Sequence, residues 1–369
     1  MLLCHSLTAK CRMRKLLLVL MQNRKDTKKL GRLGPCDFEE LNVFLTKAKG
    51  CMPNVYNNKD VLAIGDLHSD FLVTLGALYL GGAIDDNANW CGHGLLVVQT
   101  GDILDRSGRT NEVIDTAQNA REEIDILQYF HALNLQASKF GGGIISLCGN
   151  HEMTPFLQSP STPETRYEGG ALHLTGWNGL VEKRKLFQTK TLLAVYFAKF
   201  KPLIVQVRSF LFVHGGLTEG VGLGVKEINL AWQNYLLGKT NRLPEEVIDV
   251  VMDRRLSDGE ISEENCIKRT NQLFQDFGLN PNGAIVVGHT TQKNIPFFCK
   301  GRVWLIDVAM GEGFARPNLE VLRVHFSHRG VIVKTIRSIQ NGFIQVKTFE
   351  NGTFMYVDEI KRHTINETE

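Results

Sequence analysis

The sequence predicts a fold that combines α and β structure, in which strands and helices alternate first and strands dominate towards the C-terminus. Five short apolar runs are each followed at once by a cluster of glycine and polar residues; in chain order they are VLAI, LLVVQT, GIISLC, FLFV and AIVV. These runs are mostly apolar on both faces, which is typical of strands covered on each side by helices or by a second sheet.

Helical patterns separate the first of these runs. The clearest lie in residues 70–82 and 109–137, where apolar residues recur at helical spacing. A similar pattern in residues 36–50 ends in glycine and predicts a short helix that docks on the main body. The intervening stretch 154–208 fits neither pattern well. Its first half is rich in Pro, Ser, Thr and Gly, which indicates either a functional loop or disorder.

Strand-dense sequence follows the fifth run. Its segments are VWLID, LEVLRVHF, GVIVKTI, FIQVKTF and TFMYVDEI. The dipeptide Asn351-Gly352 separates the last two and is a hairpin signal. We therefore predict three parts of the chain: an N-terminal extension (1–50), a main domain (51–326) and a strand-rich C-terminal tail (327–369).

The N-terminal extension is basic, since Asp26 is the only acidic residue among its first 34 residues. It is typical of a transit peptide or of a basic surface arm, and the alternative is a solvated extension without a specific role. The eight cysteines include no CxxC pair, which predicts reduced thiols. We therefore expect an intracellular, cytoplasmic location, and the basic N-terminus leaves organelle targeting open.

Composition excludes several classes of function. The hydrophobic content of 43% and the charged content of 22% are those of a globular protein. A net charge of +3 without a basic stripe argues against binding to nucleic acid. No apolar run reaches the roughly 18–20 residues that a transmembrane helix needs. The sequence makes no prediction about oligomeric state.

Polar side chains follow all five apolar runs, where each predicted strand ends. They are Asp66 and His68; Asp102, Asp105 and Arg106; Asn150, His151 and Glu152; His214; and His289. Because ligands of α/β sheets bind beyond the carboxyl ends of the strands, we expect these side chains to converge on one edge. Oxygen and imidazole ligands without thiolates suit two hard or borderline divalent cations, in the arrangement used to hydrolyse phosphate esters.

Each cluster has a plainer interpretation when taken alone. Aspartate after glycine is common in turns, and an isolated histidine is more often a hydrogen-bonded structural residue. Only the five clusters together, in this order and each after an apolar run, favour a metal centre.

The order GD-H, GD-DR, GNHE, HGG and GH resembles the calcineurin-like metallophosphoesterases, and within them the phosphoprotein phosphatase superfamily. The insert after GNHE, the motif GHTTQ and the downstream WLIDVAMGEGF look most similar to the Shewanella-like, bacterial-type protein phosphatases. The resemblance covers about residues 59–324. It implies a four-layer αββα sandwich, with two mixed sheets flanked by helices, and makes the main domain the catalytic domain.

The resemblance also implies the metal ligands. Asp66 and His68 would hold the first cation together with Asp102, which would bridge to the second. The second cation would be held by Asn150, His214 and His289. Manganese is the first expectation for both ions, with iron or zinc as alternatives. A hydroxide bridging the two cations would attack phosphorus in line.

Further residues carry implied catalytic roles. His151 would protonate the leaving oxygen, Asp105 would orient His151, and Glu152 would support the site from behind. Arg106 would grip the phosphate oxygens. The family uses a second arginine, for which the segment MDRRLSDGE offers Arg254, with Arg255 in reserve. The plainer interpretation of this pair is a solvated Arg-Arg at a helix end.

Three departures from the family pattern concern the site. Ser69 replaces a glycine and reduces the space beside the backbone, and Ser107 precedes Gly108 in a way that could shift Arg106. Met252 stands where the family has tryptophan beside the second arginine. All six metal ligands are present, which argues against a silent binding module that has kept only the fold.

The predicted function is hydrolysis of phosphate monoesters, with a phosphorylated protein or peptide (Ser/Thr or Tyr) as substrate. The alternative is a dinucleoside polyphosphate or other nucleotide phosphohydrolase, which shares most of the same motifs. HGG and the long insert favour the protein phosphatase.

Overall fold

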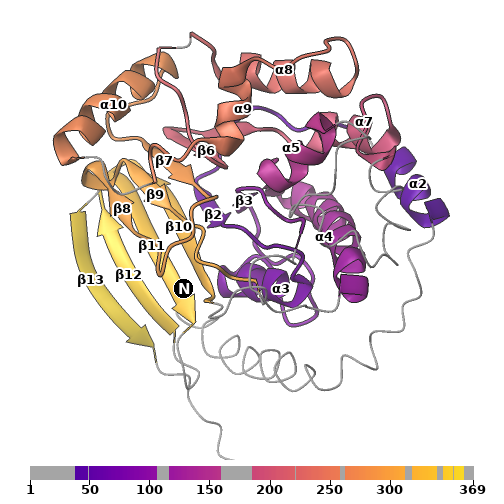
Figure 1. Ribbon diagram of the computed structural model, residues 1–369. Helices are drawn as coiled ribbons and strands as arrows, with labels where there is room; N and C mark the ends of the chain where they lie inside the picture. Colours follow the sequence, from indigo (N-terminus) through magenta and orange to yellow (C-terminus); the bar gives the residue numbers. More distant parts are fainter. Residues whose placement is uncertain are drawn as a thin grey trace, which may run out of the picture.

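The computed structural model contains two mixed β-sheets, with helices beside them (Figure 1). It describes residues 38–48, 50–105, 116–158, 185–220, 222–257, 262–311, 318–338, 344–351 and 353–360. One sheet has six strands in the order β1-β5-β6-β7-β9-β8, and the other has seven in the order β13-β12-β11-β10-β2-β3-β4.

The strands of the six-stranded sheet are β1 (Val55–Tyr56), β5 (Ile204–Val207), β6 (Phe210–Val213), β7 (Ala284–Val287), β8 (Phe297–Phe298) and β9 (Val303–Leu305). Those of the seven-stranded sheet are β2 (Asp60–Ile64), β3 (Leu96–Gln99), β4 (Gly143–Ser146), β10 (Glu320–Ser327), β11 (Gly330–Ser338), β12 (Ile344–Glu350) and β13 (Thr353–Ile360). Every residue of β3, β4, β6 and β7 is buried, which explains why these runs show no alternation.

The two sheets pack face to face through aromatic side chains. The ring of Phe210 in β6 lies 5.2 Å from that of Phe326 in β10. At the other edge, the ring of Phe349 in β12 lies 5.0 Å from Phe297 in β8 and 5.1 Å from Trp304 in β9. Interdigitated inner faces of this kind define a β-sandwich.

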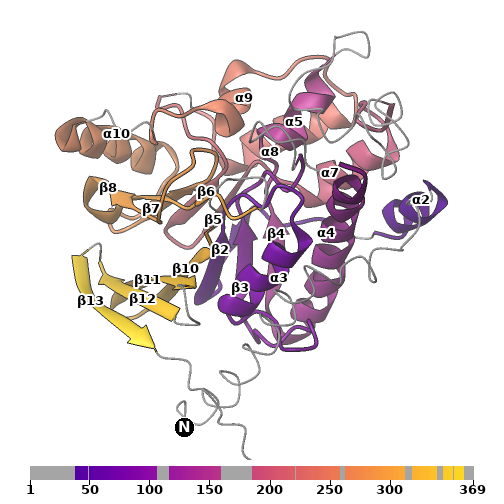
Figure 2. The ribbon, with the colours of Figure 1, turned by 60° about the horizontal axis from the view of Figure 1, so that its bottom comes forward.

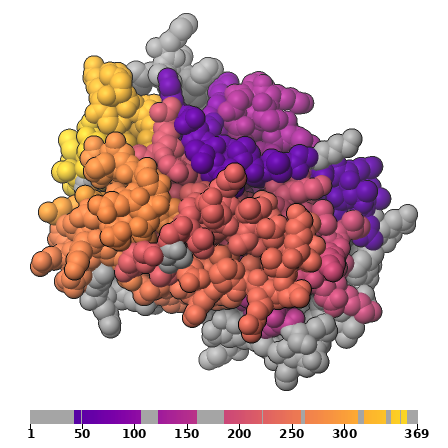
Figure 3. All heavy atoms as spheres, turned by 90° about the horizontal axis from the view of Figure 1, so that it is seen from above, coloured from indigo at the N-terminus to yellow at the C-terminus, as the bar shows by residue number. Residues whose placement is uncertain are grey.

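Helices cover the sandwich on both sides. They are α2 (Phe38–Lys47), α3 (Phe71–Leu80), α4 (Thr116–Ala137), α5 (Asn150–Leu157), α7 (Leu192–Phe200), α8 (Val225–Leu236), α9 (Glu245–Met252) and α10 (Glu263–Asp276), with the short 3₁₀ helices η1 (Ser138–Phe140) and η3 (Cys299–Gly301). In Figures 1 and 2, α3 and α4 lie beside β2, β3 and β4, and α8, α9 and α10 lie on the side of β6 and β7. The salmon and orange part of the chain, which contains α8–α10, fills most of the face in Figure 3. The predicted sandwich of two mixed sheets flanked by helices is confirmed.

Strand direction brings the polar clusters to one edge of each sheet. β2, β3 and β4 are parallel and in register, so Ile64, Gln99 and Ser146 lie side by side at their carboxyl ends. β6 and β7 are also parallel, with Val213 opposite Val287. The loops that follow these strands therefore begin at matching heights.

The C-terminal strands extend the seven-stranded sheet. β10 pairs antiparallel with β2, and β11, β12 and β13 follow as an antiparallel meander. Glu350 pairs with Thr353, so two residues connect β12 to β13, as the Asn351-Gly352 signal indicates. The boundary between residues 326 and 327 remains a prediction, and β10 runs across it.

The N-terminal helix α2 contacts the main body through Phe44. Its ring lies 5.3 Å from Tyr196 of α7 and 5.4 Å from His131 of α4. The basic segment before it lies outside the described ranges. Within those ranges, no helix combines the length and the apolar character needed to cross a bilayer.

The loop-or-disorder expectation falls mostly on residues outside the described ranges, and the expectation of reduced thiols was wrong. The stretch 154–208 contains the end of α5, all of α7 and β5, while 159–184 lies outside the described residues. Helix α7 is apolar nearly all round because it is buried, and this obscured its helical period. Instead of only reduced thiols, the structure contains a disulfide between Cys266 of α10 and Cys299 of η3, which are 33 residues apart. The local spacing of cysteines in the sequence does not predict a disulfide between residues so far apart.

Candidate metal centre

Six predicted ligands converge where the carboxyl ends of the two sheets meet. Asp66 and His68 follow β2, Asp102 follows β3, Asn150 opens α5 after β4, His214 follows β6, and His289 follows β7. All six side chains are buried, and none is more than 8% exposed. Two groups have ligand atoms within 4.8 Å of one another: His68, Asp102 and His151; and Asp102, His214 and His289. Asp102 is common to both.

His68 and two carboxylates form the first part of the centre. Nε2 of His68 lies 3.9 Å from Oδ2 of Asp66 and 3.9 Å from Oδ2 of Asp102. Nδ1 of His68 lies 3.1 Å from the carbonyl oxygen of Leu104, an acceptor only, so this nitrogen carries the proton. Nε2 is therefore the nitrogen that carries the lone pair and could coordinate a cation, as in histidine ligands whose other nitrogen is held by a backbone carbonyl.

His214 is oriented in the same way in the second part. Its Nδ1 donates to the carbonyl oxygen of Thr100 at 2.9 Å, which leaves a lone pair on Nε2. That Nε2 lies 2.9 Å from Oδ1 of Asn150, 3.4 Å from Oδ2 of Asp102 and 3.1 Å from Nδ1 of His289. Electron-rich atoms this close repel one another unless a proton or a cation lies among them. The donor set therefore fits a divalent metal.

The electrostatics of these residues agree with that fit. Burial would raise the pKa of Asp102, but the imidazoles of His214 and His151 hold it well below its usual range. Burial opposes protonation of His214, yet Asp102 raises the pKa of that histidine, so the cluster attracts positive charge. Burial, and then His214, lower the pKa of His289 to about 3, so His289 is neutral as a ligand must be.

Glu152 supports the loop that carries Asp102. Its carboxylate accepts hydrogen bonds from the backbone N–H groups of Asp102 (2.9 Å), Ile103 (2.8 Å) and Leu104 (3.1 Å). It also accepts the N–H of Gly149 at 2.7 Å. One buried carboxylate thus holds four backbone donors and ties the start of α5 to the loop after β3.

Glu123 of α4 also supports these loops, a role that the sequence did not predict. Its carboxylate accepts the backbone N–H of Asp105 at 2.9 Å and the hydroxyl of Ser69 at 3.1 Å. Ser69, which replaces the family glycine, has a left-handed φ of 58°, and its hydroxyl is used in this contact. The only sequence signal for Glu123 was an acidic residue inside a helical pattern.

His151 and Asp105 form a buried pair beside the ligands. Nδ1 of His151 lies 3.0 Å from Oδ2 of Asp105. The other ring nitrogen, Nε2, lies 3.7 Å from Oδ2 of Asp102 and so faces the centre. The backbone N–H of His151 donates to Oδ1 of Asp102 at 2.9 Å. The pair is thus oriented at both ends.

Several of these residues have strained backbones. His68, Asp102, Asp105 and His289 have φ values of 44°, 56°, 61° and 65°, in the left-handed region that favours glycine. Such conformations cost roughly 1–3 kcal/mol each and persist only where the surrounding structure enforces them, as at functional sites.

The two candidate arginines have different surroundings. Nη1 of Arg254 donates to the carbonyl oxygen of His289 at 3.2 Å and to the hydroxyl of Thr290 at 2.9 Å. Arg255 pairs instead with Asp253 at 2.8 Å and Asp249 at 3.3 Å. Of the two arginines, Arg254 thus contacts the backbone of the predicted ligand His289. Arg106 and Ser107 lie outside the described residues.

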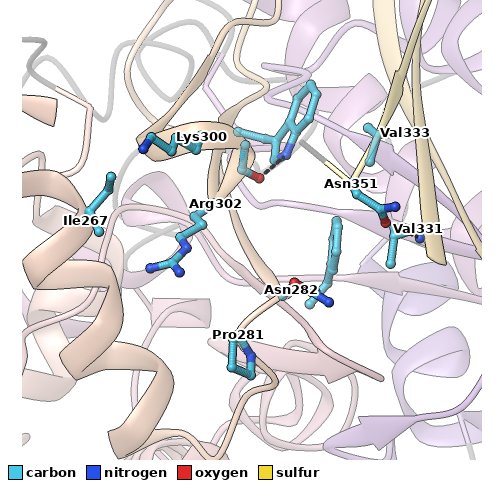
Figure 4. A pocket seen from close by; sticks show the side chains of 12 residues that line it. Ile267, Pro281, Asn282, Lys300, Arg302, Val331, Val333 and Asn351 are labelled. Atoms are coloured by element: carbon cyan, nitrogen blue, oxygen red, sulfur yellow. Dashed lines mark hydrogen bonds between the residues drawn. The ribbon is translucent and has the colours of Figure 1, made fainter. Parts of the chain in front are cut away.

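A separate cavity of about 300 Å³ lies elsewhere (Figure 4). It opens between Asn282, Arg302 and Val331, with Trp304 beside them donating its indole N–H to Gly301 at 2.8 Å. Residues 283 and 302 precede β7 and β9, so the cavity lies at the amino ends of the strands. His214 and His289 follow the opposite ends, which excludes this cavity from the metal centre.

Comparisons with known proteins agree with this geometry. The family model described as calcineurin-like phosphoesterase matches residues 59–293. Shewanella-like protein phosphatase 2 of Arabidopsis thaliana is 26% identical over 307 residues, covering 72% of this chain and 74% of that protein. Shewanella-like protein phosphatase 1 of Plasmodium berghei is 24% identical over 347 residues, covering 86% and 85%. A solved cold-active protein tyrosine phosphatase has the same fold, with a TM-score of 0.62, 21% identity and 85% coverage of each chain.

Proposed function

Because the chain belongs to the calcineurin-like phosphoesterase family, we propose that it is a metal-dependent phosphatase that hydrolyses phosphate monoesters on the side chains of phosphorylated proteins or peptides. The observation that carries this proposal is the meeting of six buried ligands with an oriented His151–Asp105 pair. Protein as the substrate is supported by two relatives that are named protein phosphatases, at 26% and 24% identity.

Asp66, His68 and Asp102 would hold one cation, and Asp102, Asn150, His214 and His289 the other. When bound, divalent cations supply Lewis-acid activation of water and neutralise charge on the phosphate oxygens. The absence of thiolates among the ligands supports manganese, with iron or zinc as alternatives. Glu152 would support the role of Asp102, because Glu152 accepts the backbone N–H of Asp102 and so fixes the backbone from which that side chain extends towards both sets of ligands.

His151 is the proposed general acid. Its Nδ1–H donates to Asp105, which stabilises the protonated imidazole and directs Nε2 towards the centre. From Nε2 it can deliver a proton to the leaving oxygen of a serine, threonine or tyrosine side chain. Arg254 is the proposed phosphate-binding arginine, which its contact with His289 supports, and the matching role of Arg106 stays a prediction.

The test is a side-by-side assay of the full chain purified with Mn²⁺. Phosphoserine, phosphothreonine and phosphotyrosine peptides are compared with a dinucleoside polyphosphate, and bound metal is measured in the same preparation. We expect turnover of at least one phosphopeptide. Turnover of the dinucleoside polyphosphate alone would favour the nucleotide phosphohydrolase. No turnover of any substrate, with metal shown to be bound, would overturn the proposal that the protein is an enzyme.

His151→Asn gives the matched variant for this assay. We expect it to lower kcat and to leave the metal content unchanged, because His151 is not among the proposed ligands. Loss of metal would mean that its role is wrongly assigned.

The intracellular, cytoplasmic location remains a prediction. So does organelle targeting by the basic N-terminus, whose residues 1–37 lie outside the described ranges.

A further inference from the structure

A buried lysine lies beneath the metal centre. Lys201 follows α7, and its side chain is almost completely buried, with 2% of the residue exposed. Its Nζ donates to the hydroxyl of Ser146 at 2.7 Å and to the carbonyl oxygen of Leu147 at 3.0 Å. Burying an ammonium group is costly unless it is well bonded and near negative charge, so its position needs an explanation.

The hydrogen bonds continue from Ser146 to both aspartate loops. The hydroxyl of Ser146 donates to Oε1 of Gln99 at 2.5 Å. The amide nitrogen of Gln99 donates to the carbonyl oxygens of Gly65 (3.2 Å) and Gly101. These glycines directly precede Asp66 and Asp102. One chain of side chains thus runs across the carboxyl ends of β4, β3 and β2.

The groups at the two ends of this hydrogen-bond chain fix the direction of every bond in it. An ammonium group has no acceptor, so Ser146 must accept from Lys201 and give its own proton to Gln99. Gln99 therefore presents its carbonyl to Ser146 and its NH₂ to the two glycine carbonyls. The two glycine carbonyls only accept and hold the glutamine NH₂ from the far end, while the lysine directs the serine proton to the glutamine oxygen from the near end.

The charge of Lys201 also matches its surroundings. Burial lowers the pKa of Lys201, while the carboxylates of Glu152 and Asp102 act in the opposite direction. Lys201 thus offsets negative charge that the metal-binding loops concentrate in the interior.

We propose that Lys201 is a positioning residue for both metal-binding loops, acting through Ser146 and Gln99 on the carbonyl groups of Gly65 and Gly101. It sets the backbone from which Asp66 and Asp102 extend and so tunes the affinity for the cations. This inference rests on the metal-dependent function proposed above. This series of hydrogen bonds has more than a structural role because it ends on the backbone that directly precedes two proposed ligands, Asp66 and Asp102.

Ser146→Ala is the central test, since it removes one hydroxyl and leaves Lys201 bonded to Leu147. Mn²⁺ binding to the metal-free full chain is measured by titration calorimetry, with the melting temperature recorded in parallel. We expect about tenfold weaker Mn²⁺ binding, the lower end of the usual effect of residues that orient metal ligands. Gln99→Leu should weaken binding at least as much, and Ser146→Thr, which keeps the hydroxyl, should restore it.

Leu273→Ala is the matched control, because Leu273 is fully buried in α10, away from this chain of hydrogen bonds. It should lower the melting temperature and leave Mn²⁺ affinity within twofold of the wild type. Unchanged Mn²⁺ affinity in Ser146→Ala, or an equal loss in Leu273→Ala, would overturn the proposal. Failure of the wild-type protein to bind Mn²⁺ would instead contradict the metal-dependent function itself.

Discussion

Nδ1 of His151 lies 3.0 Å from Oδ2 of Asp105, and both side chains are buried beside the proposed metal ligands. The carboxylate can accept only from an N–H, so it selects the imidazole state with a proton on Nδ1. Asp105→Asn keeps the shape and removes the charge that stabilises protonated His151. We expect kcat to fall by about 10²-fold or more, as for other general acids that lose their function.

Metal content measured beside kcat separates this effect from damage to the centre. Asp105→Asn should retain the wild-type content, because Asp105 is not a proposed ligand. A variant that lost metal in proportion to activity would contradict the role of Asp105.

Glu152 is expected to contribute to stability and metal binding together. Glu152→Gln puts an NH₂ group in place of an oxygen that accepts buried backbone N–H groups. Hydrogen bonds to charged groups contribute roughly 1.5–3 kcal/mol, so we expect the free energy of unfolding to fall by about 3 kcal/mol. Urea unfolding measures this loss. Glu350→Gln, on a half-buried strand position, should change it by less than about 0.5 kcal/mol.

The neighbouring arginines offer a matched pair. Arg254→Ala removes the guanidinium that contacts His289 and Thr290 and should raise KM or lower kcat for phosphopeptides by about tenfold or more. Arg255→Ala breaks a partly exposed ion pair with Asp249 and Asp253 and should change stability by at most about 1 kcal/mol. Equal kinetic effects of the two variants would argue against Arg254 as the phosphate-binding residue.

His131 should make stability depend on pH. Burial against Phe44 and Phe200 lowers the pKa of His131 below its ordinary value of 6.5. Below pH 6.5 the unfolded chain therefore binds more protons at this site than the folded chain, and stability falls as pH drops. Above that pH both states are neutral and the contribution of His131 is constant.

Urea unfolding at about pH 7.5 and pH 5.5 tests this sign. His131→Gln should reduce the loss of stability on acidification, and His328→Gln, at an exposed position, should not. The same loss in wild type and His131→Gln would show that His131 does not contribute.

The disulfide between Cys266 and Cys299 closes a loop across 33 positions. Loop-closure entropy for this length predicts that removing the bond lowers the free energy of unfolding by about 3–4 kcal/mol. Cys266→Ser and reduction of the wild-type protein should give similar losses. If reduction left the unfolding curve unchanged, the two cysteines would not be paired in solution.

The cluster of candidate metal ligands could be predicted from sequence because its signals are local. Each ligand directly follows an apolar run, and parallel strands carry such positions to one edge whatever the details of packing. The side chains of Asp66, Asp102 and His214 thus lie close together, as their residue types and their positions after the strands predicted. The helix α7 and the 266–299 disulfide were missed, because burial hides helical period and a disulfide joins distant residues.

By itself, then, the sequence predicted most of the strands, the candidate ligands and their order along the chain. Only the tertiary structure decided which ring nitrogens face the centre, that Arg254 rather than Arg255 adjoins His289, and that Glu123 supports the loops. The same holds for Gln99 and Lys201, which look unremarkable in the sequence and lie 102 positions apart. Hydrogen-bond direction and charge compensation depend on atoms brought within about 3 Å by folding, and no local pattern encodes that proximity.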